Sequence, residues 1–172
     1  MLGQLHLLAL RLYRRLPRRV RLAVVHSMTP SFTVGAICVL ERDDGALLLV
    51  RHSYRRRWGL PGGLLKRGED VADGVRREAL EEIGLEVELL GEPAVVVDPE
   101  PRRVDVVFRA RPSGATADAR SRSPEIVEIG WFPPDGLPQL QHEAASALVA
   151  LARARTEGRP WLQGASERLE GT

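Results

Sequence analysis

The stretch GLLKRGEDVADGVRREALEEIGL, residues 63–85, decides the fold of this chain. It fits the spacing G-x5-E-x7-R-E-U-x-E-E-x-G-U, where U is an apolar residue, with no position missing. Ala79 and Leu85 fill the apolar positions, and the fixed positions hold Gly63, Glu69, Arg77, Glu78, Glu81, Glu82 and Gly84. Agreement at every position is far more than chance provides, so we treat the stretch as a functional motif.

Much of this stretch is predicted to form one helix over residues 71–83. Asp70 is a good N-cap residue, and Gly84 supplies a left-handed residue just past the last turn. Apolar side chains recur at every fourth position of the helix, which predicts a face directed at a core; they are Val71, Val75, Ala79 and Ile83.

A second face of the same helix carries Glu78, Glu81 and Glu82, which the i,i+3 and i,i+4 spacings bring together. A solvated surface would explain many Glu-rich helices. Like charges at this spacing nevertheless cost about a few tenths of a kcal/mol, so we expect a cation to balance them. Oxygen ligands of this kind suit Mg²⁺ or Mn²⁺, which keep several waters and are completed by substrate phosphates. The face is therefore predicted to be a metal site for a phosphorylated substrate.

Just before the helix, residues 58–63 read Trp-Gly-Leu-Pro-Gly-Gly. The paired Gly62 and Gly63 allow a tight turn and the close approach of a backbone carbonyl to a metal ion. A plain turn would explain the two glycines equally well.

The motif resembles the signature of the Nudix hydrolases. The resemblance covers about residues 31–157 and implies an α/β fold in which a mixed β-sheet lies between α-helices. It also implies a Mg²⁺-dependent (or Mn²⁺-dependent) enzyme that cleaves phosphoric anhydride bonds, with Glu78 and Glu82 as chief ligands. Glu81 would be a further ligand or orient water, and Gly62 would lend its carbonyl oxygen.

The family pattern implies further roles outside the metal ligands. Glu69 and Arg77 would brace the loop against the helix, and Gly63 and Gly84 would be structural. A glutamate outside the motif would assist as ligand or base; Glu125 is the candidate and Glu128 is its rival. The expected catalytic set is Arg77, Glu78, Glu81, Glu82 and Glu125.

Substrate contacts are expected from the segment ahead of the glycine pair, where Arg51, Tyr54 and Arg57 could meet phosphates or stack on a base. A solvated turn is an equal alternative. Pro101 lies near a position that the family associates with ADP-ribose hydrolysis, within a proline-rich region. We therefore expect a nucleoside diphosphate derivative of the ADP-ribose or nucleotide-sugar type. The alternatives are a (d)NTP pyrophosphohydrolase of the sanitising type and a non-catalytic nucleotide-binding module.

Apolar runs on both sides of the motif predict the remaining elements. Residues 32–40 and 46–50 should form a hairpin within one sheet, because Asp43-Asp44-Gly45 between them is a turn signal. Further strands are expected at 86–90, 94–97, 104–110 and 125–132, a surface loop at 111–123, and a helix at 143–155.

Composition favours one domain with additions at each end. The 172 residues, 44% of them hydrophobic, suffice for one sizeable core at residues 31–157, followed by a tail at 158–172. The single Cys38 excludes an internal disulfide framework and favours the cytoplasm. No nucleic-acid-binding motif is seen.

Residues 1–30 read as a basic amphipathic helical arm, and residues 1–31 hold six arginines and no acid. Pro17 could open a second short helix. Packing on the rest of the chain or on a second subunit in a homodimer is preferred to contact with an anionic membrane. Neither a secretory signal nor a bilayer-spanning run is expected. The arm carries an apolar stripe at helical spacing made of Leu5, Leu8, Leu12 and Leu16.

Overall fold

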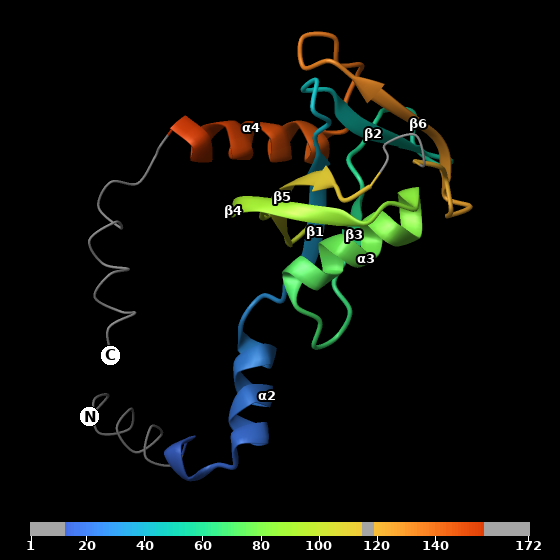
Figure 1. Ribbon diagram of the computed structural model, residues 1–172. Helices are drawn as coiled ribbons and strands as arrows, with labels where there is room; N and C mark the ends of the chain where they lie inside the picture. The colour runs from blue at the N-terminus through green and yellow to red at the C-terminus, as the bar shows by residue number, and fades with distance from the viewer. Residues whose placement is uncertain (1–12, 115–118, 157–172) are drawn as a thin grey trace, which may run out of the picture. The chain divides into compact units, whose positions relative to one another are not determined.

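The computed structural model describes residues 13–114 and 119–156 (Figure 1). The chain divides into two compact units between Phe32 and Thr33. In the first unit, α2 (Arg18–Met28) follows Pro17 at its N-cap position, as the sequence predicts. The arm's predicted stripe at Leu5, Leu8 and Leu12 lies outside the described residues. In the described part of the chain, no helix has the length and apolar character needed to cross a bilayer.

The second unit is built on a mixed four-stranded sheet in the order β3-β1-β5-β4. Its strands are β1 (Thr33–Leu40), β3 (Gly62–Leu64), β4 (Val87–Asp98) and β5 (Arg103–Pro112). β1 runs parallel to β5, and the other pairs are antiparallel. A second, two-stranded antiparallel sheet joins β2 (Leu47–His52) to β6 (Ile126–Phe132).

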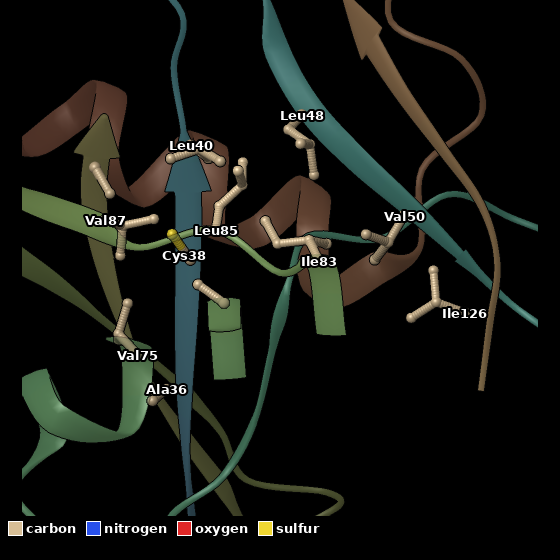
Figure 2. Packing of buried hydrophobic residues seen from close by; sticks show 12 residues of the cluster. Ala36, Cys38, Leu40, Leu48, Val50, Val75, Ile83, Leu85, Val87 and Ile126 are labelled. Atoms are coloured by element: carbon tan, nitrogen blue, oxygen red, sulfur yellow. The ribbon is translucent and has the colours of Figure 1, made fainter. Parts of the chain in front are cut away.

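Two helices cover opposite faces of the four-stranded sheet, as the alternation along β1 shows. Ala36, Cys38 and Leu40 pack with residues of α3 (Val71–Ile83), the core cluster drawn in Figure 2. Ile37 and Val39 belong to a second cluster that contains residues of α4 (His142–Thr156). Because successive side chains of a strand point to opposite faces, the expected arrangement of a mixed sheet between helices is confirmed.

The predicted hairpin turn is present, but the prediction that its two strands belong to one sheet is wrong. The N–H of Gly45 donates to the carbonyl of Arg42 at 2.8 Å, and Arg42 donates to Ala46 at 2.9 Å. The two strands then separate, joined only by a bridge between Glu41 and Leu47 among the described residues. β1 already has β3 on one edge and β5 on the other, so β2 pairs with β6 instead.

The other predicted elements are present with small changes. The strands expected at 86–90 and 94–97 are one strand, β4, with an irregularity between Leu90 and Ala94 and a left-handed Gly91 at φ 65°. Helix α3 has the predicted bounds and both predicted ends: the Asp70 carboxylate accepts from the N–H of Ala72 at 2.9 Å, and Gly84 is left-handed at φ 70°.

Candidate active site

The two glycines of β3 are positions where no larger residue fits. Gly62 has a φ of 150° and pairs with Ile37 of β1, so a Cβ there would overlap the carbonyl oxygen of Ala36. A Cβ on Gly63 would overlap the carboxylate of Glu78. The lack of a side chain thus lets Gly62 pack against β1 and Gly63 against a side chain of α3.

Beside these glycines lies a cleft of about 460 Å³. It is lined by residues from β1, β3, β5, α3 and α4 and from the segments at the end of β2 and before β6. Its charged lining residues are Arg55, Glu78, Glu82, Arg103, Glu125 and Glu143. Four carboxylates thus face two guanidinium groups among the described lining residues, and the cleft has an excess of negative charge.

Glu82 connects helix α3 to the glycine strand. It is only 8% exposed, and its Oε2 accepts a hydrogen bond from the N–H of Gly62 at 2.9 Å. Its Oε1 lies 3.6 Å from Nε2 of His52, a residue that also lines the cleft. The carboxylate is thereby fixed at the cleft wall.

One helical turn earlier, Glu78 reaches the same cleft. Burial raises the pKa of the Glu78 carboxyl, and the neighbouring Glu82 and Glu81 raise it further, whereas Arg77 opposes the shift. Nη1 of Arg77 donates to Oε1 of Glu78 at 2.7 Å. A carboxylate held near others in a partly buried site is one that a divalent cation would stabilise.

Glu81 shares Nη1 of Arg77 with Glu78, so the two carboxylates lie near each other as predicted, but Glu81 is not part of the cleft wall. Its side chain is 53% exposed and absent from the residues lining the cleft. Oε2 accepts from Nη1 of Arg77 at 3.0 Å, and Oε1 lies 3.4 Å from Nζ of Lys66. These cations lower the pKa of Glu81, the hydrogen bond from Arg77 contributing most. Glu81 is thereby held between Arg77 and Lys66.

The predicted brace between Glu69 and Arg77 is an arginine fork. Nε of Arg77 donates to one Glu69 oxygen at 2.6 Å and Nη2 to the other at 2.9 Å. The N–H of Lys66 also donates to Glu69, at 2.8 Å. These hydrogen bonds lower the pKa of Glu69 to about 2, with Arg77 the chief cause. The loop before α3 is fastened to the helix through this pair.

The two candidate outer glutamates differ in position. Glu125 lines the cleft, and its carboxylate lies 3.4 Å from the hydroxyl of Tyr54, which donates to it. Glu128 is not among the lining residues and instead accepts from Nε of Arg51 at 2.8 Å. Of the two, Glu125 is the one placed beside Glu78 and Glu82 in the same cleft.

The three residues expected to touch substrate are also divided. Tyr54 lines the cleft, but Arg51 is engaged with Glu128 on the second sheet. Arg57 lines a separate hollow, and its carbonyl accepts from Gln141. Sequence reasoning did not find Arg103, Gln141 or Glu143, which line the cleft. A signal for Arg103 existed, because Asp105, two residues later on the same strand, stands among the apolar Val104, Val106 and Val107.

The donor set fits a hard divalent cation. Mg²⁺ is usually held by one or two carboxylates, with waters and substrate phosphates completing its shell. Glu78 and Glu82 provide two carboxylates in the cleft. Within residues 13–114 and 119–156, no three His, Cys, Asp or Glu side chains gather into a group that could hold a metal alone. Other positions would thus fall to backbone oxygen, water and substrate.

Comparison with known proteins gives a family and several similar proteins. The model of the NUDIX domain matches residues 31–152. A MutT-like protein of Streptomyces ambofaciens is 36% identical over 106 residues, which are 62% of this chain and 67% of that protein. The 8-oxo-dGDP phosphatase of Mus musculus is 30% identical over 112 residues. This match spans 62% of the chain but only 33% of the phosphatase.

Among solved structures, an ADP-ribose pyrophosphatase from Streptococcus suis is similar in fold and sequence. It is 29% identical, with a TM-score of 0.56, and the match covers 73% of this chain and 93% of that one. The NUDIX match at residues 31–152 contains the whole motif, both sheets of the second unit and most of α4.

Proposed function

Because the chain belongs to the Nudix family and is a hydrolase of phosphoric anhydride bonds, we propose that it cleaves the diphosphate linkage of a nucleoside diphosphate derivative with Mg²⁺. The observation that carries this proposal is the convergence of Glu78, Glu82 and Glu125 on one cleft beside Gly62 and Gly63.

The charge of the cleft supports dependence on a metal. Arg55 lies 3.8 Å from Glu143, and Arg103 hydrogen-bonds Asp105 at 2.7 Å, so both lining arginines already have carboxylate partners. A diphosphate entering this cleft would meet an excess of negative charge, because the one guanidinium that contacts Glu78 is shared with Glu69 and Glu81. When bound there, Mg²⁺ would neutralise that charge and the charge of the substrate.

Each side chain of the motif has a distinct role in this proposal. Glu78 and Glu82, with the carbonyl oxygen of Gly62, would hold the metal. Glu81, which shares Arg77 with Glu78, would orient water, and Arg77 with Glu69 would keep the loop and helix in place. Glu125 would accept the proton of the attacking water, because it is the cleft carboxylate outside α3 that Tyr54 contacts.

For the group attached to the diphosphate, we favour ADP-ribose or a nucleotide sugar. The similarity to the ADP-ribose pyrophosphatase, over 93% of its length, supports this choice. The similarity to the 8-oxo-dGDP phosphatase supports the alternative of a purine nucleotide as substrate. Pro101 lies in the turn between β4 and β5 and is not among the lining residues, so it adds little to either choice.

The test is a substrate panel with Mg²⁺ or Mn²⁺, with products separated by ion-exchange chromatography. The panel contains ADP-ribose, a nucleotide sugar, dGTP, 8-oxo-dGTP and 8-oxo-dGDP. The reaction is identified by the product released together with the nucleoside monophosphate, which is a sugar phosphate, pyrophosphate or inorganic phosphate. Metal-dependent cleavage of one class supports the proposal. Binding of a nucleotide without cleavage under every condition would instead identify a non-catalytic binding module.

A further inference from the structure

Arg103 and Asp105 place a charged pair on the sheet face that carries the cleft. They lie two residues apart on β5, so both side chains point to the same face as Gly35 and Ile37 of the adjacent β1. Asp105 is aligned with Gly35, and Arg103 with Thr33. Arg103 lines the same cleft as Glu78 and Glu82.

Gly35 is the position that makes room for this pair. A Cβ on Gly35 would overlap Oδ1 of Asp105 and lie 2.7 Å from Nη2 of Arg103. The Asp105 carboxylate thus lies directly on the backbone of β1, with the Arg103 guanidinium beside it. Any larger residue at position 35 would displace both groups.

Burial makes the pair unusual for a structural contact. Asp105 is 4% exposed, and Nε of Arg103 donates to its Oδ1 at 2.7 Å. Burying a carboxylate costs several kcal/mol as an order of magnitude, and the attraction of a partner often does no more than offset it. An apolar residue would serve the core at least as well, so stability does not explain why the pair is there. The need for an oriented guanidinium group explains its presence.

We propose that Arg103, positioned by Asp105, determines specificity by binding an uncharged polar edge of the group attached to the diphosphate. The inference rests on the proposed function and names the part of the substrate that Arg103 recognises. With Nε engaged by Asp105, the two Nη nitrogens make no hydrogen bond to a described residue. They form the fork that matches two adjacent acceptor atoms, such as a base edge or neighbouring sugar hydroxyls.

An uncharged edge fits better than a phosphate because of the carboxylate behind the arginine. The Arg103–Asp105 pair has no net charge, and Asp105 would repel an anion brought onto the guanidinium. The other carboxylates of the lining add to this repulsion. Phosphates are therefore expected where a metal held by Glu78 and Glu82 would neutralise them, and Arg103 would meet what they are attached to.

The test measures inhibition constants against the best substrate from the panel, in wild type and in the R103Q and R103K variants. The inhibitors are GDP, ADP, ADP-ribose and inorganic pyrophosphate. R103K keeps the charge but loses the planar fork, so it should bind the nucleoside ligands as weakly as R103Q does. The matched control is R109Q: Arg109 lies on the same strand with a similar exposure of 29%, bonds Glu41 at 2.8 Å, and does not line the cleft.

We expect the inhibition constant of at least one nucleoside ligand to rise about tenfold in both Arg103 variants, with pyrophosphate unchanged and kcat within about threefold. A rise confined to GDP assigns the edge to guanine, and one confined to ADP-ribose assigns it to the second ribose. A rise shared by all three nucleoside ligands assigns it to the common ribose. R109Q should match wild type.

Asp105→Asn tests the positioning role. It should raise the same constants, and the double variant with R103Q should be no worse than R103Q alone, because Asp105 acts through Arg103. If D105N does not fold, the R103Q and R103K pair alone carries the test.

Three outcomes overturn the inference. An equal rise for pyrophosphate would show that Arg103 binds phosphate, and rescue by R103K would show that charge alone matters. Unchanged constants in R103Q, with substrate turned over normally, reject the inference and leave the proposed function standing. Absence of turnover by wild type on every substrate rejects the proposed function, and this inference with it.

Discussion

Arg77 donates hydrogen bonds to both carboxylate oxygens of Glu69, at 2.6 and 2.9 Å, while its Nη1 donates to Glu78 at 2.7 Å. The same guanidinium therefore holds the loop before α3 and touches a cleft carboxylate. The Arg77 side chain couples the geometry of the loop to that of the cleft, so a substitution at Glu69 should change both.

We expect Glu69→Gln to lower stability in a way that depends on pH. The pKa of Glu69 is lowered from its ordinary 4.5 to about 2, so the pair stabilises the fold fully above about pH 4.5. This contribution is lost as the pH falls through about 2. The free energy of unfolding of both proteins is measured with urea from pH 7 to pH 3. The difference between wild type and E69Q should become smaller as the pH falls. E88Q, which loses a solvent-exposed pair with Arg111, is the control and should show little gap at any pH.

Glu82→Gln should reduce kcat by at least about 100-fold and leave the melting temperature nearly unchanged. The amide oxygen of Gln can still accept from the N–H of Gly62, but the charge that a metal requires is gone. Mg²⁺ titration of kcat and thermal melts check both parts. Full activity at saturating Mg²⁺ would remove Glu82 from the ligand set.

Comparison of E78Q with E81Q tests whether lining the cleft distinguishes Glu78 from Glu81. Because Glu78 lines the cleft and Glu81 is half exposed between Arg77 and Lys66, E78Q should lose at least about tenfold more kcat. Equal losses would mean that Glu81 turns inward when metal and substrate bind.

Glu125→Gln should lower kcat by about 100-fold or more, and Glu128→Gln by less than about threefold. Glu125 lines the cleft, whereas Glu128 is bonded to Arg51 and lies outside it. Steady-state rates for both variants at several pH values provide the measurement. The reverse ranking would transfer the role of assisting carboxylate to Glu128.

Deletion of residues 2–28 should alter self-association or solubility while kcat stays within about twofold. No residue of α2 is buried in the described structure, and the candidate cleft is lined entirely by the second unit. Light scattering would reveal a shift from dimer to monomer, and flotation with anionic liposomes would reveal membrane contact. A large loss of kcat would show that the active site requires the arm.

Local sequence patterns predicted what local chemistry determines. Helix α3, its Asp70 cap and its Gly84 end depend on residues within one or two turns, and all three are confirmed. These features could be predicted because each depends on neighbours in the chain.

Features that depend on distant residues could not be predicted in this way. The split of β1 and β2 between two sheets is decided by β3, β5 and β6, which compete for strand edges. Helical spacing places Glu81 near Glu78, but it does not predict the contact of Glu81 with Lys66, fifteen residues earlier. The setting of Arg103 depends on the register of Gly35 with Asp105, seventy positions along the chain.

The division into two sheets has a consequence for tolerance to mutation. Glu78 and Glu82 stand on the helix that covers the four-stranded sheet, whereas Glu125 directly precedes β6 of the two-stranded one. Leu48 and Val50 of β2 pack in the same cluster as Val75 and Ile83 of α3 (Figure 2). These apolar side chains therefore help to set the distance between Glu125 and the two glutamates of α3. A misplacement of about 1 Å can cost about 100-fold in rate. Conservative exchanges at these buried positions would therefore behave as kinetic defects in a protein that still folds, and a screen for loss of turnover would recover them alongside changes in the glutamates.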